Sequence, residues 1–251
     1  MIKKPDVHEL PVTLGMVPFE AQILVEVEGD DVGKGETLPV ETGQFSVEAD
    51  GSAAGGEAPL LVVADLRQAE DIGRIFHESG ERWGGLDILV NNAGLGRKAG
   101  FHDGATEDWQ EMLDVNVLAL AVACREALGC FDGKKGGHIL NVSSMAGHRI
   151  PPGGGFYAAT KFAVRAITEC LRQELRTLGS PSRVSEISPG FVTTEFHDVL
   201  YRGDPEKIAA GLPQYRVLDP GDVAASVVHI LEAPDHVAIH DILIRSNEQE
   251  S

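Results

Sequence analysis

From residue 60 onward, short runs of apolar residues alternate with longer stretches in which apolar residues recur at helical spacing. A short apolar run that is rich in β-branched residues is typical of a parallel strand buried on both faces of a sheet. Such runs predict strands within residues 60–66, 86–91, 137–144, 184–190 and 240–245.

The stretches between these runs predict amphipathic helices, because their apolar residues fall on one helical face. We expect helices within residues 67–84, 106–131, 156–178 and 219–233. A chain in which strands alternate with helices builds a parallel sheet with helices on both faces. The expected fold class is therefore α/β, and such sheets bind their ligands beyond the carboxyl ends of the strands.

Residues 1–58 follow a different pattern. Short β-like runs alternate there with Gly-Asp and Thr-Gly turns, and no segment has convincing helical spacing. The segment is acidic, since twelve aspartates and glutamates outnumber three lysines. A connector of small residues, Gly51–Pro59, marks its end. We therefore expect an acidic β-rich segment at 1–58 and an α/β domain at 59–251.

The composition disfavours several classes of function. A formal charge of −18 over 251 residues argues against nucleic acids and anionic membrane surfaces as partners, and no apolar run is long enough to span a membrane. Cys124, Cys130 and Cys170 are an odd number in a mid-sized chain and predict the reduced thiols of a cytoplasmic protein. None of them lies in a Cys/His cluster, so the sequence predicts no metal site.

A tyrosine and a lysine four residues apart, Tyr157 and Lys161, open the third predicted helix. Such residues share one helical face, and a nearby ammonium lowers the pKa of a phenol, which is otherwise near 10. Ser144 ends the preceding strand thirteen residues earlier and can hold a substrate oxygen beside the phenol. Asn116 lies within a predicted helix, where its amide either holds a water for proton relay or is a satisfied core amide. Together the four residues suit the transfer of a hydride and a proton to a carbonyl.

Five short motifs carry a resemblance to a known family: "NNAG" (91–94), "DVNV" (114–117), "NVSS" (141–144), "YAATK" (157–161) and "SPGFVTT" (188–194). With these motifs in this order, residues of about 60–245 resemble the short-chain dehydrogenase/reductases, which are NAD(P)-dependent oxidoreductases with a Rossmann-like sheet. The chain is similar to the small-carbonyl and ketosteroid reductase subgroup. The resemblance implies a small-molecule carbonyl or alcohol substrate, NADP or NAD as cofactor with NADP slightly favoured, and a homo-oligomer packed through two long helices.

The resemblance also implies roles for individual residues. Tyr157 would be the acid/base, and Lys161 would lower its pKa and bind the nicotinamide ribose. Ser144 would orient the substrate, and Asn116 would support proton relay. The implied cofactor contacts are Asp65, Asn91, Ala93 and Gly94 on the adenosine side, and Pro189, Gly190, Val192 and Thr194 around the nicotinamide carboxamide. For Asp65, capping of the following helix is a second interpretation.

The family's N-terminal nucleotide-binding unit has no counterpart in this sequence. That unit contains a glycine-rich turn whose backbone N–H groups bind the cofactor pyrophosphate, whereas the nearest match, "DGSAAGGE" (50–57), reads as a linker. The sheet is therefore expected to be incomplete at its N-terminal strands, with a gap of about 10 Å. We expect one N-terminal β segment to pair with the sheet there. Residues of about 5–56 instead resemble half of a lipoyl-type domain, with Gln44 in place of its modified lysine.

Two functions are consistent with these patterns. The first is an NAD(P)-dependent oxidoreductase that reduces a carbonyl or oxidises an alcohol. The second is a non-catalytic or cofactor-deficient scaffold or fusion protein. Losing three charge-assisted hydrogen bonds to pyrophosphate, at about 1.5–3 kcal/mol each, weakens binding by about a thousandfold or more. NAD and NADP are not distinguished, because the unit that reads the ribose 2′ position is the missing one.

Overall fold

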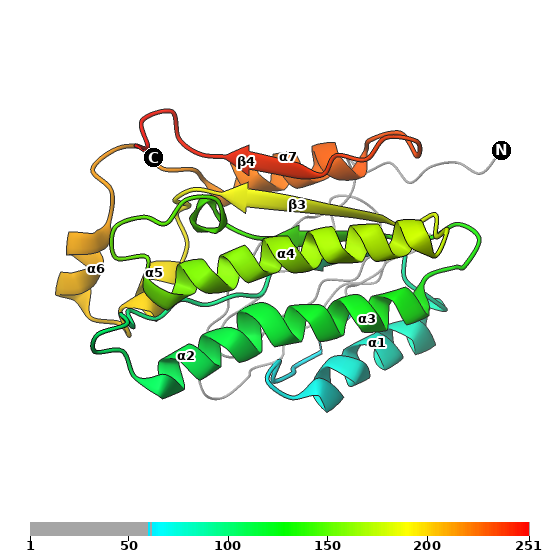
Figure 1. Cartoon of the computed structure of the whole chain (residues 1–251), viewed down its shortest axis with the longest axis horizontal. Helices are drawn as coiled ribbons and strands as arrows, with labels where there is room; N and C mark the ends of the chain where they lie inside the picture. Colours follow the sequence, from blue (N-terminus) through cyan, green and yellow to red (C-terminus); the bar gives the residue numbers. More distant parts are fainter. Residues whose placement is uncertain (1–59, 61, 251) are drawn as a thin grey trace, which may run out of the picture.

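The computed structural model describes residue 60 and residues 62–250 (Figure 1). Several expectations lie outside this described part: the acidic β-rich segment at 1–58, its lipoyl-like resemblance, and the pairing of an N-terminal strand with the sheet. None of the described helices is both long enough and apolar enough to cross a membrane.

Four parallel strands form the sheet of the described part. They are β1 (Ile88–Asn91), β2 (His138–Val142), β3 (Arg183–Pro189) and β4 (Asp241–Ile244), and they lie side by side in the order of the sequence. Each of them coincides with an apolar run that predicted a strand, although β3 begins one residue before the predicted range 184–190. The α/β fold class with a parallel sheet is confirmed.

Of the strand expected at 60–66, the described residues, 60 and 62–66, do not form a strand. Val63 is half exposed between buried neighbours, as in a strand, but the backbone of this segment bonds to side chains of the next helix. Asp71 accepts a hydrogen bond from the Asp65 N–H at 2.8 Å, and Arg74 donates one to the Val63 carbonyl at 2.7 Å. A strand needs a neighbouring backbone as its partner, and here the helix takes that place. The burial that this apolar run predicts is therefore found, but its predicted pairing as a strand of the sheet is not.

Helices follow the apolar segments as the spacing predicts. The long ones are α1 (Ala69–Trp83), α2 (Thr106–Leu113), α3 (Leu120–Cys130), α4 (Gly155–Thr177) and α7 (Pro220–Leu231). The short ones are the 3-10 turn η4 (Met145–Gly147), α5 (Phe196–Leu200) and α6 (Pro205–Gly211). A π-helical segment, η3 (Asp114–Ala119), joins α2 to α3, so the helix expected at 106–131 is one run with a wider turn in its middle. Wider turns of this kind are frequent at functional sites.

Local sequence signals explain where two of these helices begin and end. Asp219 caps α7 in a reciprocal capping box with Asp222, and Pro220 occupies the first helical position, where no backbone N–H is needed. α1 ends at Gly84, whose φ of 81° is a left-handed conformation that glycine adopts without steric cost.

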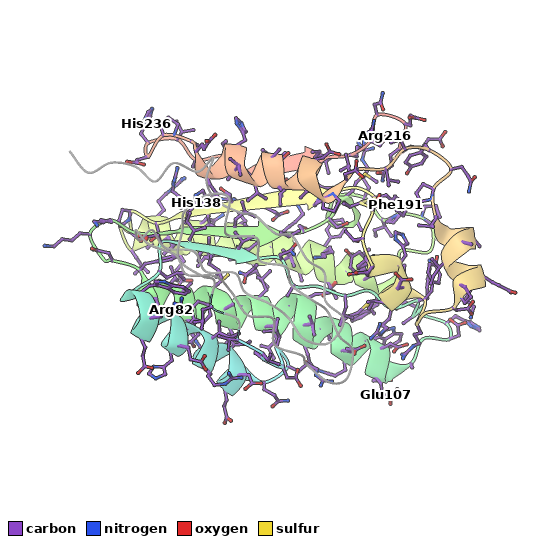
Figure 2. The ribbon with its side chains drawn as sticks, turned by 180° about the vertical axis from the view of Figure 1, so that it is seen from behind. Arg82, Glu107, His138, Phe191, Arg216 and His236 are labelled. Atoms are coloured by element: carbon purple, nitrogen blue, oxygen red, sulfur yellow. The ribbon has the colours of Figure 1, made fainter. Side chains whose placement is uncertain are left out.

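Helices cover both faces of the sheet, as expected. Leu89, Ile139 and Val184 belong to one apolar cluster together with residues of α1, α3 and α4. Leu140 belongs to a second cluster, which includes Val227 of α7. Because successive side chains of a strand point to opposite faces, the two clusters lie on opposite sides of the sheet. Seen from behind, α7 lies in front of the strands (Figure 2).

Candidate active site

The carboxyl end of β2 leads into the turn that carries the predicted serine. Ser144 caps η4, and its Oγ accepts a hydrogen bond from the Ala146 N–H at 3.1 Å. α4 follows this turn and presents Tyr157 and Lys161 in its first two turns. The neighbouring Ser143 is buried and donates a hydrogen bond to the Lys161 carbonyl at 3.2 Å. Ser143 therefore joins β2 to α4, which leaves Ser144 as the serine that faces the phenol.

The structure brings Tyr157 and Ser144 together. The Ser144 hydroxyl lies close enough to the Tyr157 phenol to influence its pKa, and the Tyr157 ring centre lies 5.3 Å from that of Phe196 in α5. Burial raises the pKa of Tyr157 to about 12, and the nearby Ser144 hydroxyl partly opposes this rise. The phenol is therefore protonated at neutral pH and is able to donate a proton.

Lys161 lies buried on the same side of α4. Its Nζ donates a hydrogen bond to the Val142 carbonyl at 3.0 Å and lies 5.8 Å from the centre of the Tyr157 ring. Burial lowers the pKa of Lys161 to about 8, and the negative charge of Glu186 partly opposes this fall. An ammonium has three N–H donors, so the bond to Val142 leaves donors that suit the hydroxyl groups of a ribose.

Asn116 lies in the π-helical segment and is buried. Its Oδ1 accepts a hydrogen bond from the Leu95 N–H at 2.8 Å. Its Nδ2 donates to the Leu95 carbonyl at 2.8 Å and to Thr160 Oγ1 at 3.0 Å. The side chain therefore has the satisfied bonding of a core amide, the second of its two interpretations. It fixes the segment after β1 against α4, one residue before Lys161.

Replacing Asn116 with alanine should lower the free energy of unfolding by about 2–4 kcal/mol, because the buried N–H and carbonyl of Leu95 both lose a partner. Urea denaturation followed by circular dichroism measures this change. Gln110→Ala is the matched control, since Gln110 precedes η3 and bonds only at the exposed surface to Asp114; we expect a change within about 0.5 kcal/mol. Equal stabilities of Asn116→Ala and wild type would contradict the bracing role.

Two of the predicted adenosine contacts, Asn91 and Ala93, line a small pocket at the carboxyl end of β1. The other walls of the pocket include Leu66, Val90, Asn92 and Ala119. The Asn91 side chain itself braces β1, because its Nδ2 donates to Asn141 Oδ1 at 2.9 Å and to Cys124 Sγ at 3.3 Å.

In the sequence, Asp65 precedes β1 and Gly94 follows it. The Asp65 carboxylate forms an ion pair with Arg67 at 2.7 Å, which lowers the pKa of Asp65. The N-cap position of α1 is Gln68 and not Asp65, so the capping interpretation of Asp65 is wrong. At Gly94 an added Cβ would lie 3.4 Å from the Lys161 Nζ. The backbone therefore passes close to the ammonium that is expected to bind the cofactor.

The predicted contacts on the nicotinamide side form the turn after β3. Pro189 is the last residue of the strand, and Gly190 follows it. A Cβ at Gly190 would meet the Gln249 side chain and lie 2.9 Å from the Arg245 Cβ, so the absence of a side chain at Gly190 leaves room for Gln249 in its present position. Gln249 Oε1 also accepts a hydrogen bond from the Phe191 N–H at 3.1 Å. The C-terminal segment thereby packs against the turn.

The rest of that turn is held at two points. Val192 forms an isolated parallel bridge with Leu218, and Thr194 Oγ1 accepts a hydrogen bond from the Phe196 N–H at 3.4 Å. These contacts fix the start of α5, the helix whose Phe196 packs against Tyr157.

Two buried polar residues at this end of the sheet were not predicted from the sequence. Gln249 is 5% exposed and Glu186 is 3% exposed. Glu186 also belongs to a group with His148 and Asp241, in which each side chain has an atom within 4.8 Å of the others. These residues are far apart in the sequence, so no spacing motif indicates them. Because Arg165 also approaches Glu186, at 3.5 Å, we describe the group as an ion-pair cluster.

Comparison with known proteins places this site in a family. A sequence profile of the short chain dehydrogenase family matches residues 46–204. A Bos taurus protein named dehydrogenase/reductase SDR family member 11 is 47% identical over 189 residues, which cover 74% of each chain. The chain therefore belongs to the short-chain dehydrogenase/reductase family of oxidoreductases.

Two solved structures of similar proteins contain NADP. The closed form of a serine dehydrogenase complexed with NADP+ has a TM-score of 0.70 and 34% identity, and the match covers 75% of this chain and 76% of that one. A metagenomic short-chain oxidoreductase in complex with NADP has a TM-score of 0.63 and 27% identity, over 79% and 78% of the two chains. These relatives support a nicotinamide cofactor and the Rossmann-like character of the sheet.

Proposed function

We propose that this chain is an NAD(P)-dependent oxidoreductase that reduces a small carbonyl compound or oxidises the corresponding alcohol. The observation that carries the proposal is a serine hydroxyl beside a phenol, Ser144 and Tyr157, with the Lys161 ammonium 5.8 Å from the centre of the phenol ring. Membership of the family supports it. NADP is favoured over NAD because both similar structures described above hold NADP.

The chain's own residues supply binding and proton transfer, and a bound reduced nicotinamide would supply the hydride. Ser144 Oγ holds the carbonyl oxygen of the substrate beside the phenol. Tyr157 donates its proton to that oxygen as negative charge develops on it. The Lys161 ammonium then favours the phenolate electrostatically. For alcohol oxidation the same proton moves in the opposite direction.

Aromatic residues around Tyr157 support an apolar substrate. Phe196 lies against the Tyr157 ring, and at the start of α4 Phe156 stacks on Trp109 with 5.4 Å between ring centres. Phe101, which is 70% exposed, extends this aromatic group toward solvent. Apolar walls with a few convergent polar groups are the usual composition of a small-molecule site.

We also propose that the protein is a cytoplasmic homo-oligomer, with neither nucleic acid nor membrane as a partner. Leu113, Leu118 and Phe162 are exposed apolar residues on the two long helical runs, α2–α3 and α4. Their exposure supports packing of these helices against a second copy. The formal charge of −18 supports the absence of polyanionic partners.

A cofactor-deficient scaffold is the second candidate function. The observation that favours it is the lack of a glycine-rich phosphate-binding turn in the sequence before residue 60. Such a protein would keep the Ser144–Tyr157–Lys161 arrangement without holding a dinucleotide.

Titration with NADPH, followed by the fluorescence of the reduced nicotinamide, separates the two candidates. For the oxidoreductase we expect saturable binding, with a Kd below about 1 mM even if a missing pyrophosphate cradle costs about a thousandfold. Tyr157→Phe should bind NADPH as wild type does, because that change removes only the proton donor. An absence of binding up to millimolar NADPH would favour the scaffold.

A further inference from the structure

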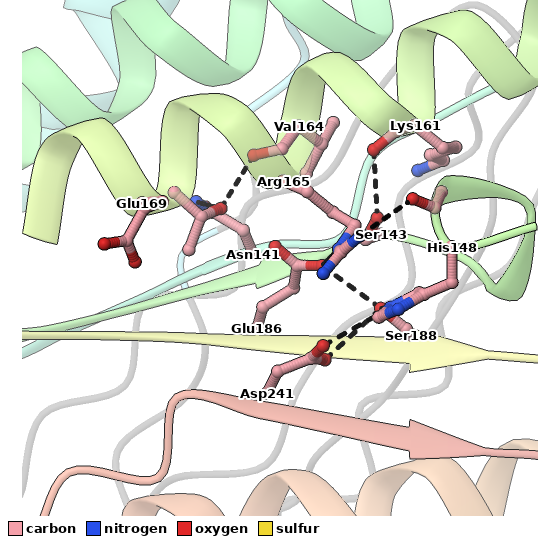
Figure 3. Close-up of polar contacts among 12 residues, drawn as sticks. Asn141, Ser143, His148, Lys161, Val164, Arg165, Glu169, Glu186, Ser188 and Asp241 are labelled. Atoms are coloured by element: carbon pink, nitrogen blue, oxygen red, sulfur yellow. Dashed lines mark hydrogen bonds and ion pairs between the residues drawn. The ribbon is translucent and has the colours of Figure 1, made fainter.

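Different contacts hold the two sides of the candidate site. On the α4 side, Ser143 donates its hydrogen bond to the Lys161 carbonyl at 3.2 Å (Figure 3). The other side is α5, whose Phe196 packs against Tyr157. A helix of five residues is too short to be stable by itself. Contacts with the rest of the protein must therefore hold α5 in its place.

A buried guanidinium, that of Arg97, reaches α5 from the segment that follows β1. Only 4% of Arg97 is exposed. Its Nη1 donates a hydrogen bond to the Val199 carbonyl of α5 at 2.7 Å, and its Nε donates one to Glu111 Oε2 of α2 at 2.7 Å. Burying a charge is costly unless an opposite charge accompanies it. The Glu111 carboxylate supplies that charge and orients the guanidinium toward Val199.

The backbone next to this guanidinium leaves room for α5. An added Cβ at Gly96 would lie 2.7 Å from Phe196 Cζ and 3.1 Å from Leu200 Cδ1, so α5 lies directly on the main chain there. Val199 packs against the apolar cluster that includes Leu95. Apolar contacts are non-directional, whereas a charge-assisted hydrogen bond to one carbonyl has a defined geometry. That bond therefore fixes where α5 lies on this surface.

We propose that Arg97 is a positioning residue of the oxidoreductase site, which holds α5 in the place where Phe196 forms a wall beside Tyr157. This inference rests on the proposed function for its catalytic meaning. An apolar substrate whose carbonyl oxygen lies between Ser144 and Tyr157 would have Phe196 at its side. The docked position of α5 therefore sets how well such a substrate binds. Arg97 acts through α5 and not on the reacting atoms.

The test measures the place of α5 through the Tyr157 signal in a nuclear magnetic resonance spectrum. The three tyrosines of the chain are labelled with 13C at the ring Cε, and the Tyr157 signal is assigned by its loss in Tyr157→Phe. Phe196→Leu supplies the chemical shift of Tyr157 without the neighbouring aromatic ring. We expect Arg97→Met to move the Tyr157 signal at least about half of the way to that reference, because a buried charge-assisted bond to a short helix is lost.

Arg202→Met is the matched control. Arg202 also links the chain at the end of α5 to α2, through an ion pair with Asp108, but its side chain is 65% exposed. An exposed ion pair contributes little to stability. The Tyr157 signal of this variant should therefore stay at the wild-type position. Circular dichroism shows whether each variant is folded.

An unmoved Tyr157 signal in folded Arg97→Met overturns the proposal, as does an equal movement in Arg202→Met. If Arg97→Met does not fold, Glu111→Gln supplies the measurement. It leaves the buried guanidinium without its opposite charge, so the Tyr157 signal should move in the direction of the Phe196→Leu reference. An unmoved signal in Glu111→Gln then overturns the proposal.

None of these measurements uses turnover or cofactor. If the Tyr157 signal moves as expected and wild type has no turnover, the proposed function fails while the role of Arg97 in holding α5 stands. In an active enzyme, Arg97→Met should raise the KM for an apolar ketone by at least about twofold, because only molecules with docked α5 bind the substrate. The kcat should stay within about twofold of wild type, since α5 is docked in every complex. An unchanged KM together with a moved signal overturns the positioning role.

Discussion

Tyr157→Phe should lower kcat for carbonyl reduction by about 10²–10⁴-fold, the range that a positioned general acid contributes. The phenol is the proton donor in the proposed chemistry, and its pKa of about 12 keeps it protonated across the neutral range. Phenylalanine keeps the ring that packs against Phe196, so the fold and the affinity for NADPH should change little. Steady-state rates with a panel of apolar ketones measure the loss.

A second tyrosine provides the control for this experiment. Tyr215 lies outside the cluster of Ser144, Tyr157 and Lys161, and Tyr215→Phe should leave kcat within about twofold of wild type, as expected for a substitution away from the chemistry. Retention of more than a tenth of the wild-type rate by Tyr157→Phe would exclude Tyr157 as the proton donor. Another acid would then have to deliver the proton.

Lys161→Met should lower kcat/KM by at least about 10²-fold, since it removes both the charge that favours the phenolate and a donor for the cofactor. The NADPH Kd should rise as well, which separates this variant from Tyr157→Phe. A normal NADPH Kd would contradict the role of Lys161 in cofactor binding.

The effect of Lys161→Met on the free energy of unfolding should depend on pH. The pKa of Lys161 falls from its usual value of 10.5 to about 8 on folding. The unfolded chain therefore binds more protons than the folded one between these values, and the ammonium destabilises the folded state by about 3 kcal/mol below pH 8. This destabilisation is relieved as the pH rises from about 8 to 10.5. Relative to Lys161→Met, wild type should gain about 2–3 kcal/mol between pH 7 and pH 10.

Urea denaturation of wild type and Lys161→Met at the two pH values measures this difference. Titrations shared by both proteins cancel in the comparison. Lys207→Met is a suitable control, because the Lys207 side chain is 68% exposed; we expect its free energy of unfolding to stay within about 0.5 kcal/mol of wild type. A difference between wild type and Lys161→Met that is independent of pH would show that Lys161 titrates normally in the folded protein.

Most of the sheet could be predicted because burial on both faces leaves a continuous apolar run in the sequence. The runs that became β1, β2 and β3 contain the buried Leu89, Ile139 and Ile187, one in each strand. The proximity of Ser144, Tyr157 and Lys161 could also be anticipated, because a strand end and a helix start meet at the same edge of a parallel sheet.

The remaining differences arise from partners that a sequence pattern does not specify. Residues 62–66 have the burial pattern of a strand, but side chains of α1 bond to the backbone of Val63 and Asp65. The pattern at Asn116 allowed two interpretations, and only the structure shows the bonds of its amide to Leu95 and Thr160. Glu186 lies in β3, and several of its neighbours come from segments distant in sequence, so only the folded structure shows what surrounds it.

The π-helical segment Asp114–Ala119 also sets the phase of the helices on either side of it. A π-turn accommodates one residue more than an α-turn, which corresponds to about 100° of rotation around the helix axis. Met112 before the segment and Ala123 after it are both buried with that extra residue present. Deletion of a single residue here would leave two intact helices whose apolar faces no longer point the same way. The connection between β1 and β2 is therefore constrained in its residue count, and a deletion there is a more severe change than most substitutions.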